Sequence, residues 1–395
     1  MRAFSLIASF AALLLQLAQP LPVRADDKDP VVADRKKSEW LDMLRTEDNA
    51  RRRKVAVSAL GQISSTYPDH SKEILTAIGR ALRNDTAAGV RLQAAIVLGQ
   101  SANAILDKAA TRVDPRDIVT DLTENLRVEK ETDVRKEVCS ALGMYGIISK
   151  PAVVPLTAAL ADADPSVRTA AADALGRVGP DAKTALDALI LLVKDKELTV
   201  RSAAVFAIGR LKLEDNASAS AALIPLLKEP DVELRKTAIT SLCLLADRNT
   251  AVVQSVASAL RDENVEIRQR VAQSMSKFGP ALKNVESELT RALKEDADKL
   301  VRYYALRTLC EGFGPDAKGL LPLLTERLKL EKEFEVQIAI AEELGGIASS
   351  SELNKAEMDK LISALREAQR DPNLKVRIAA SEAMKRAQKG PVKPK

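Results

Sequence analysis

A short pattern recurs ten times along the chain and constrains its fold more than any other feature. In most copies an apolar residue precedes an arginine, and small apolar residues follow it until a large aliphatic side chain seven positions later. The pattern is centred on Arg53, Arg91, Arg135, Arg168, Arg201, Arg235, Arg268, Arg302, Gln337 in place of arginine, and Arg377. Successive centres lie 33 to 44 residues apart. A period of this length without a strand pattern is typical of stacked helical repeats.

Within each copy, the residues three and seven positions after the arginine are apolar, as Ala171 and Leu175 are after Arg168. These offsets fall on one face of a helix. A second helical pattern lies upstream, most clearly over residues 181–194, and Gly-Pro pairs such as Gly179-Pro180 separate some units. Since Gly suits a helix C-terminus and Pro can open the next helix, each unit is expected to be a helical hairpin. The predicted fold class is all-α, an α-solenoid of about ten antiparallel helix pairs.

These units resemble HEAT repeats, in the short form also found in phycobilin-lyase-like HEAT proteins. The sequence from Asp164 to Arg168 followed by Ala171 to Gly176 carries the resemblance best, and similar copies extend over most of residues 39–388. The resemblance implies a superhelical scaffold whose second helices line the concave side. Because this fold hosts several functions, it does not by itself identify one.

An acidic residue lies six positions before every pattern centre. The ten are Glu47, Asp85, Glu129, Asp162, Asp195, Glu229, Asp262, Asp296, Glu331 and Asp371. In HEAT proteins such acids and arginines form a ladder between repeats, so the resemblance implies a structural role. The residues predicted to form it are Arg168, Arg201, Arg235, Arg268 and Arg302 with Asp162, Asp195, Glu229, Asp262 and Asp296. The alternative, a row of arginines that grips phosphates, is disfavoured because each arginine is matched by an acid.

The N-terminal sequence predicts export. Residues 4–18 are apolar apart from two serines and one glutamine, Arg2 precedes them, and prolines follow. This is the layout of a secretory signal peptide, with cleavage expected after Ala25, and it is too short for a membrane-spanning helix. Residues 26–38 are expected to be a flexible leader, and residues 389–395 a basic disordered tail. The chain is thus predicted to be an exported bacterial protein, periplasmic or extracellular, with no transmembrane segment after processing.

The charge balance argues against a nucleic-acid partner. The full chain has a formal net charge of +5, and the predicted signal peptide contributes Arg2 and Arg24 but no acid, which leaves +3. Such a small excess over some 370 residues does not build the electrostatic field that binding to phosphate backbones requires.

The sequence offers no catalytic set. His70 is the single histidine, and the three cysteines, Cys139, Cys243 and Cys310, all fall in second helices, where they are expected to be small buried side chains. No metal-ligand spacing, Gly-rich phosphate loop or nucleophile motif accompanies them. The prediction is a protein that is not an enzyme, with no cofactor and no metal.

Surface recognition is the remaining function. Phe206, Tyr303, Tyr304, Arg307 and Gln273 lie at second-helix positions expected to face the concave side, and aromatic and arginine side chains are enriched in binding hot spots. The alternative is that the aromatic rings cover neighbouring helices. We expect a non-catalytic scaffold or adaptor of the bacterial cell envelope that binds a protein or peptide. The two alternatives are a bilin-lyase-like HEAT enzyme, against which the signal peptide argues, and a nucleic-acid-binding HEAT protein.

Overall fold

The structure, a computed structural model, describes residues 23–24, 28–107 and 112–389. These residues fall into two compact units, called unit 1 and unit 2, which are divided between Ala188 and Leu189. Unit 1 begins with three short strands and continues as helices. Its elements are β1 Val23–Arg24, β2 Val31–Val32, β3 Arg35–Lys36, α2 Lys37–Thr46, α3 Ala50–Thr66, η1 Pro68–His70, α4 Ser71–Asn84, α5 Ala88–Gln100, α6 Ala102–Leu106, α7 Pro115–Val128, α8 Thr132–Met144, η2 Gly146–Ala152, α9 Val153–Ala159, α10 Pro165–Val178 and η3 Gly179–Ala185. The boundary between the units falls inside α11 Leu186–Leu192.

Among its described residues, unit 2 is built from helices alone. They are α12 Leu198–Arg210, α13 Ala217–Leu223, η4 Ile224–Lys228, α14 Val232–Leu245, α15 Thr250–Ser258, η5 Ala259–Arg261, α16 Val265–Ser274, η6 Met275–Val285, α17 Glu286–Glu295, α18 Lys299–Phe313, η7 Gly314–Leu320, α19 Leu321–Leu330, α20 Phe334–Ser350, α21 Lys355–Ala368 and α22 Leu374–Lys389. The predicted tail, residues 389–395, lies outside the described residues except for Lys389, which ends α22.

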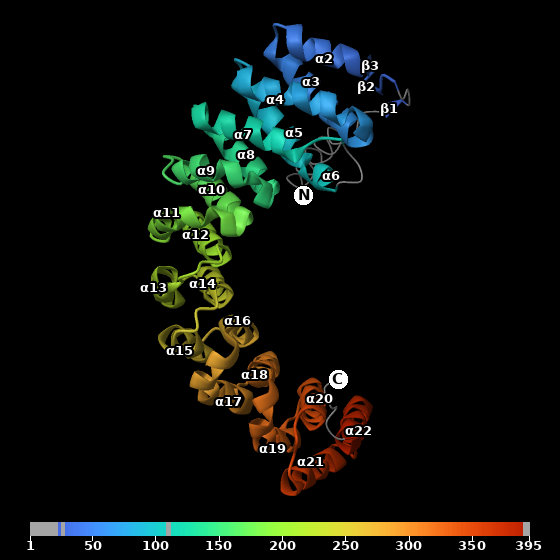
Figure 1. Ribbon diagram of the computed structural model, residues 1–395, viewed down its shortest axis with the longest axis vertical. Coiled ribbons are helices and arrows are strands. Elements are labelled where there is room, and N and C mark those ends of the chain that lie inside the picture. Colours follow the sequence, from blue (N-terminus) through green and yellow to red (C-terminus); the bar gives the residue numbers. More distant parts are fainter. Residues whose placement is uncertain (1–22, 25–27, 108–111, 390–395) are drawn as a thin grey trace, which may run out of the picture. The chain divides into compact units, whose positions relative to one another are not determined.

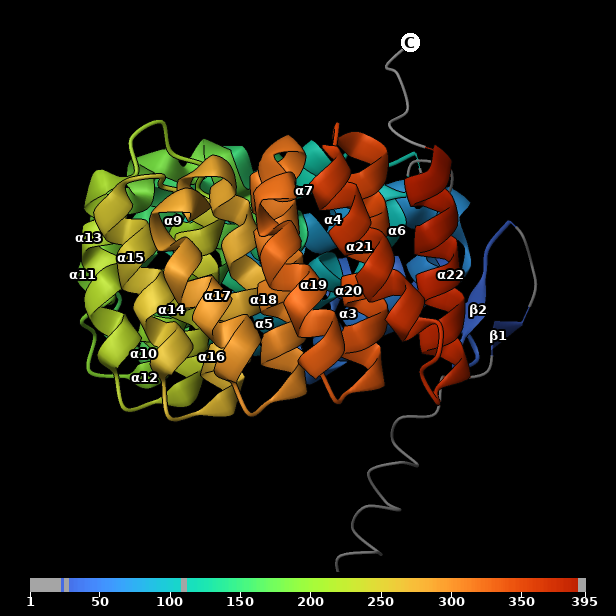
Figure 2. The same cartoon turned by 90° about the horizontal axis from the view of Figure 1, so that it is seen from below.

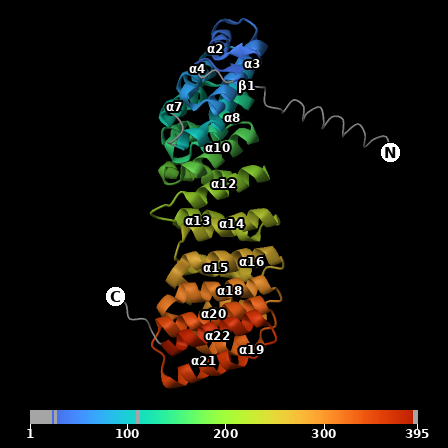
Figure 3. The ribbon, with the colours of Figure 1, turned by 90° about the vertical axis from the view of Figure 1, so that its right-hand side faces the viewer.

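Each unit consists of two layers of helices. The first helix of every pair lies in one layer and the second helix in the other (Figure 1). Within unit 2, consecutive pairs stack in sequence order, and the second helices α12, α14, α16, α18, α20 and α22 line the inner side of the curve that this unit makes (Figures 1 and 3). Seen along the stack, the helices of unit 2 run side by side with their turns gathered at the edges (Figure 2). All ten pattern centres lie on second helices, and the predicted all-α solenoid is confirmed.

The core lies between the two layers, as the offsets in the sequence predict. All ten residues three positions after the pattern centre, from Ala56 to Ala380, have no exposed surface. Seven positions after it, nine side chains are fully buried and the tenth, Met384, is 7% exposed. A small side chain and, one turn later, a large one therefore fill the space between neighbouring repeats, and burial of this stripe supplies the hydrophobic driving force for stacking.

The Gly-Pro pairs mark the breaks between repeats. Gly179 adopts φ +72° and ψ −129°, and Gly279 adopts φ +54°, backbone conformations that residues with a Cβ avoid. The chain then runs through the 3-10 stretches η3 and η6 before the next first helix begins. Glycine is therefore required here because the chain must reverse direction between a second helix and the next first helix.

Residues 28–38, expected to belong to a flexible leader, are folded onto the first helix pair. A two-residue turn at Ala33 and Asp34, both with positive φ, joins β2 to β3. Val32 is fully buried, and its carbonyl accepts a hydrogen bond of 3.0 Å from the indole N–H of Trp40. Composition alone indicated a solvated segment, but the hairpin covers Trp40, which would otherwise expose a large apolar ring at the end of the stack. β1 lies within the segment predicted to be cleaved, and Val23 pairs with Val32.

Each arginine of the pattern performs two tasks, seen most fully at Arg302. Its Nη1 donates to the carbonyl oxygens of Asp296 and Ala297, at 2.8 and 3.0 Å, and so closes the turn of its own repeat. Its Nε and Nη2 donate to the carboxylate of Glu331, the acid of the next repeat, at 2.9 and 2.8 Å. One side chain therefore fixes a turn and ties that repeat to its successor through a bidentate pair.

Ion pairs between consecutive repeats recur in both units, although at Arg235 only Nη2 reaches the carboxylate and Nε has no partner among the described residues. The ion pairs between consecutive repeats join Arg53 to Asp85, Arg91 to Glu129, Arg135 to Asp162, Arg235 to Asp262, Arg268 to Asp296 and Arg302 to Glu331. Gln337 occupies the arginine position with an uncharged side chain, and its Nε2 donates a hydrogen bond to the carboxylate of Asp371 at 3.3 Å. Arg168 donates to the carbonyl oxygen of Asp162 at 2.9 Å, and the carboxylate of Asp195 accepts from the N–H of Glu197.

Arg201 departs from the predicted ladder. Its Nη1 donates to the carbonyl oxygens of Asp195 and Lys196, but its Nε has no partner, and within the described part of unit 2 no ion pair joins it to Glu229. In an intact rung, the carboxylate also accepts the N–H two residues later, as Glu331 does from Glu333. Pro230 follows Glu229, and Asp231 caps α14 through the N–H of Leu234. A proline and a capping residue also follow Asp371, which keeps its bonds to the N–H of Asn373 and to Gln337, so the local sequence does not explain the missing pair at Glu229.

We predict that Arg91→Ala lowers the free energy of unfolding by about 3 kcal/mol, because it leaves the buried carboxylate of Glu129 without the guanidinium group that it pairs with. Arg201→Ala is the matched control and should cost about 1 kcal/mol, since it removes hydrogen bonds to backbone carbonyls but no ion pair. Urea unfolding followed by circular dichroism measures both. Equal losses in the two variants would contradict the role assigned to the ion pairs.

Candidate functional site

The arginine row was the first candidate for a ligand site, and its geometry makes it structural. The paired guanidinium groups are enclosed, with side-chain exposures of 11% for Arg302, 10% for Arg235 and at most 19%, for Arg135. Their donors are directed to carboxylates and turn carbonyls of the chain itself. An external phosphate would have to displace these partners, so the row does not form a polyanion-binding surface.

The carboxylates of the intact rungs are held in their charged form. Burial by itself would raise the pKa of Glu331, but hydrogen bonds from Arg302 and from the N–H groups of Glu333 and Lys332 outweigh it and lower the pKa from 4.5 to about 2. For Glu129, burial is likewise outweighed by hydrogen bonds from Arg91, the N–H of Glu131 and Asn125, and the pKa is lowered to about 2. Both rungs therefore stay ionised at neutral pH.

Three of the predicted binding residues lie together on α18. The rings of Tyr303 and Tyr304 meet edge to face, with centroids 5.4 Å apart, and both side chains are half-buried. Arg307 follows one turn later, where its Nη1 donates to Glu343 Oε1 on α20 at 2.7 Å and its Nη2 contacts Glu311 at 3.3 Å. This cluster combines two aromatic edges with a partly exposed ion pair on the second-helix face of unit 2.

The other two predicted residues lie on separate helices of the same layer. Phe206 on α12 is 37% exposed, and the guanidinium of Arg210 lies 5.4 Å from its ring centroid, a cation–π contact. Gln273 on α16 is exposed. Gln273 lies on α16, which is next to α18. Phe206 lies on α12, and α14 lies between α12 and α16. The five residues thus form two clusters on one face, not a single pocket.

Sequence reasoning missed the position nine residues after the pattern centre, which is exposed in four consecutive repeats of unit 2. It holds Arg210, Leu244, Lys277 and Glu311, and Leu244 is 47% exposed. Position nine lies one helical turn beyond position five, so the repeat register could have identified it. Positions two, five and nine after the pattern centres, taken over the repeats from α12 to α22, are here called the second-helix stripe of unit 2.

Charge changes sign along this stripe. Among the described residues, the side chains of Arg270 on α16 and of Lys277 at the start of η6 form no ion pair, which leaves two cations available beside Gln273. Further along the stack, Glu311, Glu342 and Glu382 are exposed on α18, α20 and α22. Position nine of α22 is the exposed Arg386, so the stripe presents apolar and cationic groups on its earlier helices and both carboxylates and a cation on its last ones.

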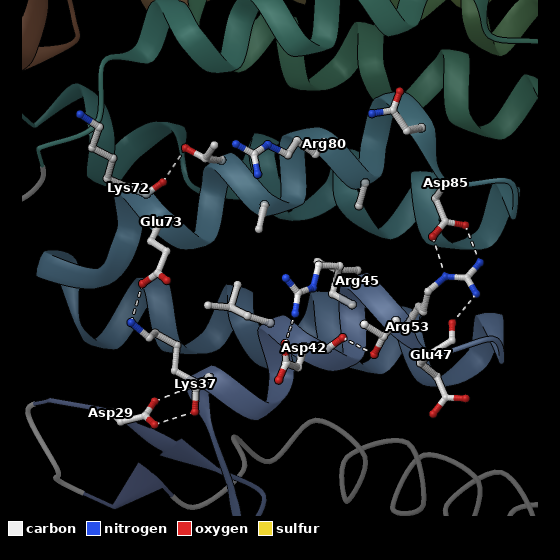
Figure 4. Close-up of a pocket in the computed structure, with 18 of the residues that line it drawn as sticks. Asp29, Lys37, Asp42, Arg45, Glu47, Arg53, Lys72, Glu73, Arg80 and Asp85 are labelled. Carbon is white, nitrogen blue, oxygen red and sulfur yellow. Dashed lines mark hydrogen bonds and ion pairs between the residues drawn. The ribbon is translucent and has the colours of Figure 1, made fainter.

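A further cavity lies elsewhere, between α2 and α4 in unit 1. It has a volume of about 1440 Å³ and is lined by seven acidic and seven basic side chains among others. Figure 4 shows that several of these are already paired across or along the groove, Arg53 with Asp85, Lys37 with Glu73 and Arg45 with Asp42. Balanced and mutually paired charges give this groove little net attraction for a charged ligand.

The described residues supply little for catalysis. Cys139, Cys243 and Cys310 are buried and unpaired, and burial raises the pKa of Cys139 to about 12, which leaves its thiol protonated and unreactive. His70 lies 3.3 Å from the Nζ of Lys37. No group of three histidine, cysteine or acidic side chains converges as metal ligands anywhere in the described ranges.

Comparison with known families identifies the repeats. The profile of the HEAT-repeat family matches residues 153–223, 220–286 and 286–385, which together span more than half of the chain. The chain belongs to the HEAT-repeat family. The earlier pairs lie outside these matches but share the same helix order and the same arginine-to-acid rungs. A search of curated proteins gives no match to the sequence.

Among solved structures, the fold resembles importin beta, as crystallised in an ammonium sulfate condition. The TM-score is 0.56, with 12% sequence identity over 88% of this chain and 51% of that chain. This chain thus spans about half the length of the importin beta chain, and at such identity the likeness shows the fold alone. HEAT solenoids commonly bind proteins and typically lack catalytic activity. Of the helices that the structure describes, none is both long and apolar enough to span a bilayer.

We predict that the chain loses stability as the pH falls from about 4.5 to about 2. Glu331 and Glu129 have folded-state pKa values near 2, below the ordinary 4.5, so their pairs stabilise the fold above pH 4.5 and are lost as protonation proceeds towards pH 2. Urea unfolding between pH 2 and 7 measures the slope. Glu331→Gln should flatten this slope and lower stability at pH 7, whereas Glu352→Gln, an exposed site outside the ladder, should change neither. An unchanged slope in Glu331→Gln would refute the assignment.

Proposed function

We propose that the protein is a non-catalytic scaffold of the bacterial cell envelope that holds a protein or peptide along the second-helix stripe of unit 2. The observation that carries this proposal is the stripe itself. It gathers two exposed apolar side chains, Phe206 and Leu244, and the unpaired cations Arg270 and Lys277 on one face of consecutive helices. Apolar anchors flanked by charge are the composition of protein recognition surfaces.

The stripe favours a partner of a particular charge pattern. Its cations Arg270 and Lys277 lie on α16 and at the start of η6, and its carboxylates Glu311, Glu342 and Glu382 follow on later helices, with Arg386 on α22. A complementary partner carries acidic residues near α16, an apolar residue that reaches Phe206 or Leu244, and basic residues towards α18 and α20. Such pairing sets the direction in which the partner lies and speeds its association more than it adds to affinity.

Assignment to the cell envelope depends on the N-terminal sequence. An arginine, an apolar stretch over residues 4–18 and a short segment ending in Ala25 support secretion followed by cleavage. The scaffold would then meet its partner outside the cytoplasm.

Crosslinked capture from the envelope fraction tests the binding surface. With the full mature chain as bait, Phe206→Ala should reduce recovery of the partner at least tenfold, about 1.4 kcal/mol, because it removes an exposed anchor. Lys277→Glu should weaken capture further at low ionic strength. Leu330→Ala is the matched control, since Leu330 is 59% exposed at the end of the first helix α19. A partner lost equally from Leu330→Ala, or retained by both stripe variants, would contradict the proposed surface.

Intact-mass measurement tests export separately. Protein recovered from the envelope or the medium should begin at Asp26, with residues 1–25 absent. Recovery of the unprocessed chain from the cytoplasm alone would remove the envelope part of the proposal and leave the binding surface to be judged by the capture experiment.

A further inference from the structure

A second cavity opens on the second-helix side of unit 1, between α3 and α5, and its lining carries no charge. Its volume is about 360 Å³. The residues that line it are Ser58, Gly61, Gln62, Ser64, Ser65, Ser71, Leu75, Gln93, Val97, Gln100, Ser101, Ala104 and Ile105. In a chain in which 29% of residues are charged, thirteen neutral lining residues set this cavity apart from the groove between α2 and α4.

The lining is arranged as two polar rows above an apolar floor. Along α3, Ser58, Gln62 and Ser65 are spaced to share one face, and along α5 Gln93 and Gln100 lie two turns apart on one face. Leu75, Val97 and Ile105 are at most 7% exposed and form the floor. The two helices meet there, because a Cβ placed on Gly61 would approach Val97 Cγ1 to 2.8 Å.

The two glutamine side chains of α5 are available to a ligand. Within the described chain, neither Gln93 nor Gln100 forms a side-chain hydrogen bond, and Gln93 is half-buried. The nearby serines use their protons internally, since Ser65 Oγ donates to the carbonyl oxygen of Gln62 at 2.9 Å and Ser101 Oγ to that of Leu98 at 2.7 Å. Their oxygens remain as acceptors, whereas each glutamine offers both a donor and an acceptor.

We infer that this cavity binds the uncharged amide side chain of a glutamine or asparagine in a peptide. A primary amide has a donor and an acceptor side by side and can pair with Gln93 or Gln100 in both senses at once. A carboxylate or an ammonium group would lose its hydration without gaining a counter-charge, because the lining has none. No lining residue is aromatic, so the cavity provides no flat ring on which a sugar could stack. The site lies in unit 1 and is independent of the stripe proposed for unit 2.

Two probes of the same shape test this inference. N-acetyl-glutamine N-methylamide should bind the full chain at millimolar concentration and shift the side-chain amide resonances of Gln93 and Gln100 in nuclear magnetic resonance spectra of glutamine-labelled protein. N-acetyl-glutamate N-methylamide has nearly the same volume but a negative charge, and it should cause no shift. Binding of the glutamate probe with equal affinity, or no shift with either probe, would overturn the inference.

Isosteric variants locate the site. Gln93→Glu and Gln100→Glu each place a carboxylate in the lining and should raise the dissociation constant of the glutamine probe at least tenfold. Gln273→Glu makes the same change on the exposed surface of α16 and should leave it unaltered. Gln100 is exposed, so its variant is expected to fold normally, as a melting curve verifies. Binding that survives both substitutions would place the probe elsewhere and refute the site.

Discussion

In most repeats a single side chain, the arginine near the start of the second helix, holds one repeat in register with the next. Hydrophobic burial between the layers is non-directional and would tolerate sliding or rotation of one repeat against the next. The guanidinium group restricts this movement because its rigid fork binds two turn carbonyls of its own repeat and the carboxylate of the next. The enclosed carboxylates depend on the pairing, since a buried charge without a partner is strongly destabilising.

This use of charge also decides which surface remains for function. The acids and arginines of the pattern bind one another and the turn carbonyls. The positions one, five and nine residues after the arginine have no part in these contacts, so their side chains can differ from repeat to repeat. In unit 2 they combine Phe206 and Leu244 with unpaired cations, whereas in unit 1 they include Ser58, Gln62 and Gln100. A common core with different faces is how a repeat protein can offer several binding sites.

The sequence predicted the helix pairs and the core because both follow from a period that ten copies repeat. It also identified the acids and arginines, but not the absence of an ion pair at Arg201 among the described residues, because a proline and a polar capping residue follow Glu229 just as they follow Asp371, which does bind its partner Gln337. The hairpin over Trp40 was missed because its stability comes from one tertiary contact and not from local composition. The two binding clusters could be predicted only as a list of positions, since a small rotation of a helix determines which side chains are exposed.

Crosslinking mass spectrometry of the chain bound to its partner tests the central claim most directly, namely that the second-helix face is the recognition surface. The account predicts crosslinks from the partner to side chains such as Lys236 and Lys385 on the second helices of unit 2 and Lys277 just after α16. Crosslinks confined to the first helices, for example to Lys294 on α17 and Lys329 on α19, would contradict it.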